Sequence, residues 1–238
     1  MTSNETRKMH RRFAERALEP RYRFPEAARL VARPTETVRR WAVGHQRLYR
    51  GKPATDKPLI QIDGSTEQGH LPLSFLNLIE LRFLGSYRQG VSLPAIRRAL
   101  DFAAQELSVD RPLLELEFAA HGRELFLRYA EESGEQYFLN ASRRGQVAWP
   151  EGATMLLESL EYDAGEHAAY RWWPLGKQRP VLLDTRLNGG RPSTAEAGVR
   201  TVAIAMRARS GWSTDDIADD VAASTDEVEA ALQLEQAA

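Results

Sequence analysis

The segment Phe24–Gly44 reads FPEAARLVARPTETVRRWAVG and decides how the first part of the chain folds. Its apolar spacing is typical of a helix–turn–helix, in which a small residue lies where two helices cross and further apolar residues follow at fixed offsets. These positions, with a tryptophan that completes the packing, are Ala28, Val31, Val38 and Trp41. Pro34 breaks the chain between the helices, and Thr35 is suited to cap the second. The segment therefore predicts helices over 25–32 and 36–43.

The outward face of the second predicted helix carries threonine and arginine. In helix–turn–helix proteins that bind DNA, the first residues of this helix meet base edges in the major groove. Arginine reads guanine edges or binds phosphates, and threonine contacts phosphates or a thymine methyl. The predicted DNA-binding residues are Thr35, Thr37, Arg39 and Arg40 on the helix and Arg47, Arg50 and Lys52 after it. The alternative is an ordinary helical pair with a basic solvent face.

Charge is divided unequally along the chain, although the 238 residues carry a net charge of only −1. Residues 1–100 hold 19 Lys and Arg against 9 Asp and Glu, a net charge of +10, and residues 101–238 carry −11. From Gly211 onward there are 8 acidic residues and no Lys or Arg. This asymmetry predicts a polyanionic partner for the first part of the chain and a different partner for the second.

Hydrophobic periodicity predicts an α+β, mainly helical protein in three parts. Residues 1–107 form a helical DNA-binding domain, with further helices over 75–87 and 93–107 and a loop or hairpin that includes a strand-like run at 59–62. Residues 108–179 form a small β-rich connecting segment. Residues 180–238 form an acidic three-helix domain, expected to bind a partner protein or to dimerise.

Short apolar runs place the elements of the last two parts. In the connecting segment we expect strands at 114–118, 125–129, 137–140 and 147–149, a short helix at 154–162 and an extended stretch at 170–173. The last part begins with an extended stretch at 180–183 and a glycine-containing loop at 188–193. Helices follow over 197–209, 214–222 and 225–234, and Thr214 and Thr225 are suited to cap the last two.

The last two predicted helices repeat the packing pattern of the first two with opposite charge. Each core position lies 190 residues after its counterpart, at Ala218, Val221 and Val228. The outward positions are then Thr225, Asp226, Glu227, Glu229 and Ala230. Because phosphates repel acidic side chains, this second pair is expected to be a poor DNA reader. The alternatives are a protein-binding or dimerising module and a plain three-helix cap.

Several other classes of function are disfavoured. The absence of cysteine excludes disulfides and thiolate metal sites. The histidines are scattered without paired metal-ligand spacing, and no nucleophile elbow, P-loop or dinucleotide fingerprint appears. No apolar run approaches the roughly 18 residues that span a bilayer. We therefore expect a cytoplasmic protein that is not an enzyme, has no cofactor or metal and does not enter a membrane.

The first part of the chain resembles the MerR type of winged helix–turn–helix. The stretches EAARL (26–30) and TVRRW (37–41) are similar to the first two helices of that family. Residues 73–87 and the pattern Gly90-x-Ser92-x-x-x-Ile96 are similar to its later helix pair. The resemblance implies a winged-helix-like DNA-binding fold, with the wing within Arg47–Gly69.

The last part resembles a small bacterial domain of unknown function that occurs in antitoxins. The matching residues are Val181, Asp184, Arg186, Gly189-Gly190-Arg191-Pro192, Gly211, Ser213, Ile217, Val228 and Leu232. The chain departs from the usual pattern at Thr185, which replaces a proline, and at 197–200, where Ala-Gly-Val-Arg replaces Gly-Thr-Arg-Ile. With its MerR-like first part, the chain is similar over nearly its whole length to VapB-type antitoxins of type II toxin–antitoxin operons.

This resemblance implies two partners. One is the operon's own promoter, as double-stranded DNA bound by a homodimer. The other is a PIN-like (VapC-type) ribonuclease toxin, held inactive by direct binding. Because such toxins use clustered acids and a divalent metal, the expected toxin-binding residues are the basic Arg186, Arg191 and Arg200. The alternative for each arginine is an ion pair within the chain. The alternative function is that of a MerR-like transcriptional regulator with no toxin partner.

Overall fold

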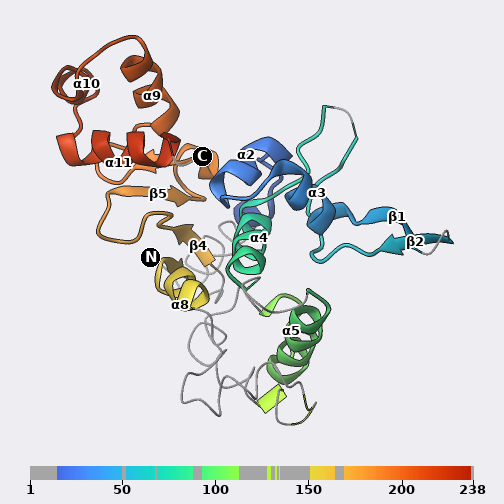
Figure 1. Ribbon diagram of the computed structural model, residues 1–238. Coiled ribbons are helices and arrows are strands. Elements are labelled where there is room, and N and C mark those ends of the chain that lie inside the picture. Colours follow the sequence, from blue (N-terminus) through green and yellow to red (C-terminus); the bar gives the residue numbers. More distant parts are fainter. Residues whose placement is uncertain are drawn as a thin grey trace.

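The computed structural model describes residues 15–49, 52–67, 69–87, 93–112, 128–129, 132, 134, 151–163 and 169–236 (Figure 1). We call residues 15–112 the head and residues 160–236 the tail. The head contains α2 (Phe24–Leu30), α3 (Thr35–Val43), β1 (His45–Tyr49), β2 (Lys52–Asp56), α4 (Phe75–Tyr87) and α5 (Leu93–Leu107). Helix α8 (Glu151–Glu158) packs against α4.

The tail combines a small antiparallel sheet with a group of helices. Its elements are β3 (Leu160–Tyr162), β4 (Ala169–Trp172), β5 (Val181–Asp184), the 3₁₀ turn η2 (Asn188–Gly190), β6 (Ser193–Thr194), α9 (Thr201–Arg209), α10 (Thr214–Val221) and α11 (Thr225–Gln236). The strands are ordered β3-β4-β5-β6, and α11 packs on β5, β6 and α9. The predicted α+β, mainly helical class is confirmed.

The helix–turn–helix forms as its apolar spacing predicts. Four side chains at the predicted core positions are buried: Ala28, Val31, Val38 and Trp41. Helix α2 ends because Ala32 adopts a left-handed φ of +52°, and the Arg33 N–H then donates to the Ala28 carbonyl at 2.9 Å. Helix α3 begins at Thr35 with Pro34 in the capping position, so the prediction that Thr35 caps this helix was wrong.

A β-hairpin follows α3 directly. Strands β1 and β2 pair antiparallel, with Tyr49 opposite Lys52, which agrees with a wing after the recognition helix. The strand-like run at 59–62 was a wrong prediction, because it forms no strand. Two of its backbone groups form hydrogen bonds with neighbouring helices instead. Leu59 N donates to the Trp41 carbonyl of α3 at 2.7 Å, and the Gln61 carbonyl accepts from Asn77 Nδ2 of α4 at 2.7 Å.

A buried polar cluster fixes this loop to α4 and to the segment that follows α5. Arg111 donates to Asp63 at 3.0 Å and to Glu80 at 2.9 Å. Asn77 Oδ1 accepts the backbone N–H of Asp63 at 3.1 Å. Burial raises the pKa of Glu80 in spite of its bonds to Arg111. These contacts hold the chain after the hairpin against α4 and the segment after α5.

The connecting segment is described only in part. The predicted strands at 114–118, 137–140 and 147–149 lie outside the described residues, and at the end of 125–129 the described Arg128 and Tyr129 are helical. The helix predicted over 154–162 ends at Glu158, and its last residues form β3. The extended stretches at 170–173 and 180–183 are β4 and β5. These two strands pair across the predicted domain boundary at 179/180.

Serines one residue before the predicted threonines cap the last two helices. Ser213 Oγ accepts the Asp216 N–H at 3.1 Å, and Ser224 Oγ accepts the Glu227 N–H at 3.2 Å. In turn, the Glu227 carboxylate accepts the Ser224 N–H at 3.1 Å, and the two hydrogen bonds together form a capping box. Thr214 and Thr225 are therefore the first helical residues, and the prediction that they cap was wrong by one position.

The sheet carries a charged cluster whose stability depends on pH. Asp184 is 3% exposed and accepts from Arg171 at 2.9 Å and Arg186 at 2.7 Å. Burial raises its pKa, but the bonds from Arg186 and Arg171 outweigh burial and the net pKa is lowered. Its stabilising contribution is therefore present above the unfolded-state pKa of about 3.9 and is lost as pH falls through the lower folded-state value.

We predict that Asp184→Asn lowers the free energy of unfolding by about 3 kcal/mol at pH 7, because it removes the carboxylate that Arg186 and Arg171 share and leaves only Arg171 with another carboxylate, that of Glu161 at 2.9 Å. Urea unfolding followed by circular dichroism at pH 7 and at falling pH measures this difference. The difference should shrink below about pH 4. A difference that stays constant with pH would contradict the role given to this carboxylate.

Candidate nucleic-acid interface

The predicted DNA-binding side chains of α3 lie on its accessible face. Thr35, Arg39 and Arg40 are exposed, and Thr37 is half-buried. The Arg39 guanidinium lies 5.3 Å from the centre of the Phe24 ring. Arg40 forms a 3.4 Å ion pair with Glu36, one turn earlier, and both partners are exposed. Such an exposed pair contributes little and leaves Arg40 free to exchange partners.

The remaining predicted DNA-binding residues belong to the hairpin or lie next to it. Arg47 is in β1 opposite Ala54, and Lys52 is the first residue of β2. Arg50 lies outside the described residues. Figure 1 shows the hairpin projecting away from the end of α3. Helix α3 and the hairpin are thus adjacent elements, as in a winged helix–turn–helix.

Arg33 and Arg82 bring two positive charges together beside the turn. Arg33 Nη2 donates to the Gly85 carbonyl, and Nη1 donates to the Ala32 carbonyl at 3.3 Å. Gly85 allows this approach, because a Cβ there would lie 3.1 Å from Arg33 Nε. The pKa of Arg82 is lowered, first by burial and then by the charge of Arg33. Within the described ranges neither guanidinium has a carboxylate partner. The sequence alone gave no signal for this pair.

The arginines predicted to bind a toxin are placed differently from one another. Arg186 forms an ion pair with Asp184 at 2.7 Å and lies over the Tyr170 ring. Arg191 is paired with Glu26 of the head. Arg200 is exposed just before α9. Two of the three thus have the intramolecular partners that the sequence left open as an alternative.

The second helix–turn–helix has the same backbone conformation as the first at the turn between its two helices. Ala222 has φ +52°, the same value as Ala32 190 residues earlier, and Ala218 and Val228 are buried like their counterparts. The outward positions were predicted wrongly in two cases, because Glu227 is 2% exposed and Ala230 is fully buried. Helix α11 packs on α9 and the sheet, and this packing covers Ala230.

The buried Glu227 carboxylate accepts hydrogen bonds from the backbone around it. Its Oε1 accepts the N–H groups of Glu196 at 2.8 Å and Ala197 at 3.0 Å. Burial raises its pKa, but these donors and Ser224 outweigh burial and hold the pKa below its usual range. Glu196 and Ala197 are therefore tied to the start of α11. This explains why the predicted helix from 197 begins only at Thr201.

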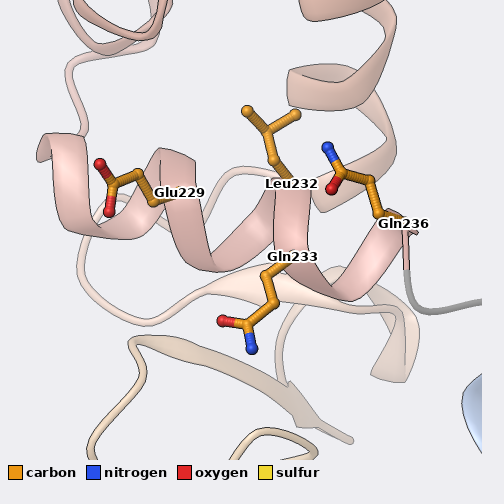
Figure 2. Close-up of a pocket in the computed structure, with 4 residues that line it drawn as sticks. All are labelled: Glu229, Leu232, Gln233 and Gln236. Carbon is orange, nitrogen blue, oxygen red and sulfur yellow. The ribbon is translucent and has the colours of Figure 1, made fainter.

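The accessible part of α11 forms a shallow hollow lined by Glu229, Leu232, Gln233 and Gln236 (Figure 2). Leu232 and Gln233 point to opposite sides of the helix. None of these four side chains is basic. The helix that corresponds to the recognition helix therefore lacks the positive charge that binds phosphates.

The head folds as a helix–turn–helix, and the predicted DNA-binding side chains of α3 lie on its accessible face. Residues 20–100 match a family model described as "Putative DNA-binding HTH domain". The chain is 28% identical over 222 residues to "Putative antitoxin VapB45" of Mycobacterium tuberculosis strain H37Rv, an alignment that covers 90% of this chain and 92% of the relative. The resemblance to VapB-type antitoxins with a helix–turn–helix, inferred from sequence motifs, is confirmed.

A solved structure shares the fold. The crystal structure of Rv2018 from Mycobacterium tuberculosis superposes with a TM-score of 0.70 at 24% identity, over 90% of this chain and 98% of the other. Together, the relative and the matched domain support an antitoxin with DNA binding. Across the described ranges, no helix combines the length and apolar character needed to cross a membrane.

Proposed function

We propose that the protein is the antitoxin of a type II toxin–antitoxin pair, which binds its own promoter as a homodimer and neutralises a PIN-like ribonuclease by direct contact. The observation that carries DNA binding is the exposed row of Thr35, Arg39 and Arg40 on a helix whose inner face is buried. A helix of this kind presents its N-terminal residues to the major groove. In a dimer, two such helices would meet half-sites about 34–36 Å apart.

Toxin binding is assigned to the tail. Its support is the similarity to a relative named as an antitoxin, together with the acidic face of the second helix–turn–helix, which disfavours DNA there. Of the predicted toxin-binding arginines, Arg200 is exposed, whereas Arg186 and Arg191 would have to exchange their present partners.

The test is co-expression with the neighbouring gene of the operon, followed by pull-down, mass spectrometry and a ribonuclease assay, and by titration of promoter DNA. We expect a co-purified PIN-like protein whose nuclease activity is suppressed, and promoter binding that weakens with salt. If the protein purifies alone and leaves nuclease activity unchanged but still binds the promoter, it is a regulator without a toxin partner. If it binds no promoter DNA, the DNA-binding assignment fails.

Arg33 and Arg82 extend the proposed phosphate-binding surface beyond the predicted residues. We predict that Arg82→Gln reduces the slope of log affinity against log salt by about 0.9, the value for one lost phosphate contact. Fluorescence anisotropy with promoter DNA at several salt concentrations measures the slope. Arg209→Gln, which removes an exposed arginine from α9 in the tail, is the matched control and should leave the slope unchanged. Equal slopes for the two variants would exclude Arg82 from the interface.

A further inference from the structure

The side of α2 that faces away from α3 is held by the tail. Tyr22, Glu26 and Arg29 are spaced four and three residues apart, a spacing that places side chains on one side of a helix and its lead-in. The Tyr22 hydroxyl donates to the Gly190 carbonyl, and Glu26 is ion-paired with Arg191. Arg29 is ion-paired with Glu235. These three head residues therefore form a docking face for the tail, and we call the contact set the head–tail clasp: Tyr22, Glu26, Arg29, Gly190, Arg191 and Glu235.

The glycines of η2 make this approach possible. Gly190 has φ +77°, and a Cβ there would lie 2.8 Å from the Tyr22 hydroxyl. A Cβ at Gly189, φ +64°, would lie 2.8 Å from Arg21 Nη1. Tyr22 itself is fully buried. Glycine at 190 is thus favoured by contact with the buried Tyr22 as well as by its positive φ, whereas glycine at 189 is favoured by its positive φ, because the flexible Arg21 side chain could move aside.

Two charged residues of the tail, Arg191 and Glu235, complete the contact with the head. Arg191 Nη2 donates to the Arg21 carbonyl at 2.9 Å, in addition to its ion pair with Glu26. Glu235, near the end of α11, is 9% exposed and pairs with Arg29. Its second oxygen accepts from Thr201 Oγ1 at 2.6 Å. The hydrogen bond from Thr201 therefore fixes the Glu235 carboxylate within the tail, and its other oxygen pairs with Arg29 of the head.

Helix α2 transmits the tail's position to α3. Only seven residues long, α2 is too short to be stable alone, so its place depends on what packs around it. One side carries Ala28 and Val31 against Val38 of α3, and the other side carries the clasp. Since recognition side chains must be held to within about 0.5 Å, a shift of α2 displaces the surface that reads DNA.

We propose that the head–tail clasp positions the recognition helix, so that Glu26, Arg29, Arg191 and Glu235 are positioning residues for DNA binding although they do not touch DNA. The inference rests on the proposed DNA-binding function. It reverses the simplest expectation from the charge distribution, in which the acidic C-terminal part opposes DNA and is independent of the head. Changes in the tail at the clasp weaken promoter binding more than equal changes of charge elsewhere in the tail.

A charge swap tests the proposal. Arg191→Glu places two carboxylates face to face at Glu26 and is expected to lower promoter affinity by about tenfold or more. Glu26→Arg with Arg191→Glu restores an ion pair with the same net charge as the wild type, and its affinity should return to within about threefold of the wild-type value. Arg209→Glu, an equal charge change at an exposed tail position, should have a smaller effect than Arg191→Glu.

Hydrogen exchange of the free full-length protein is the second readout. We expect Arg191→Glu to speed exchange in α2 and α3 while α9–α11 keep their protection, and the double variant to reverse this. The inference is overturned if Arg191→Glu binds DNA no more weakly than Arg209→Glu, or if the charge swap fails to recover affinity. If the wild type binds no promoter DNA, the proposed function fails. The positioning role of the clasp is overturned separately if hydrogen exchange in α2 and α3 is the same in Arg191→Glu as in the wild type.

Discussion

Replacing Arg39 and Arg40 together by alanine is expected to lower promoter affinity roughly 30- to 20,000-fold, because each base contact by arginine is worth about 1–3 kcal/mol and two contacts together about 2–6 kcal/mol. Both side chains are exposed on α3, and the weak Glu36–Arg40 pair is the main contact to be given up on binding. The measurement is an anisotropy titration at two salt concentrations, which separates lost charge from lost sequence recognition.

Two further variants make this result interpretable. Glu36→Gln frees Arg40 from its partner and removes a negative charge near the phosphates, so it should tighten binding modestly. Arg209→Ala removes an arginine from the tail and should leave affinity unchanged. If the double alanine variant binds as tightly as the wild type, α3 is not the recognition helix.

Replacing Trp41 by alanine is expected to destabilise the protein by about 3–5 kcal/mol, because it opens a cavity at the centre of the helix–turn–helix. The side chain is 3% exposed and packs with Val31 and Val38 in the core of the head. Chemical unfolding followed by circular dichroism gives the change in unfolding free energy.

Trp212 offers the matched control. It is 45% exposed at the turn before α10, so Trp212→Ala should change the free energy of unfolding by no more than about 0.5 kcal/mol. A similar loss of stability for the two tryptophan variants would contradict the assignment of Trp41 to the core of the DNA-binding fold.

The helix–turn–helix was predictable because its information is local. Helical spacing alone puts Ala28, Val31 and Val38 on one face, and two helices packed through that face leave Arg39 and Arg40 outside. The bounds of α4 and α5 agree with the sequence prediction for the same reason. The predicted DNA-binding residues remain a prediction that binding measurements must test.

The features that could not be predicted from the sequence depend on contacts between segments that are far apart in the chain. Glu227 looked outward by analogy with Thr37, yet it is buried because residues 196 and 197 need its oxygen atoms. The Gly189–Gly190 pair was typical of a loop, and nothing in its composition indicated that Tyr22 approaches it. Helical periodicity describes one helix face at a time and carries no information about which remote segment covers it.

The separation of the clasp partners along the chain has a consequence for the order of folding. Glu26 and Arg191 are 165 residues apart, and Arg29 and Glu235 are 206 apart. Synthesis proceeds from the N-terminus, so the DNA-reading helix pair leaves the ribosome long before the residues that hold it. Closing such long loops is also slow. On the clasp proposal, a nascent chain or one that lacks α11 carries the recognition residues without their final placement, and competence to bind the promoter is acquired only once α11 has been made.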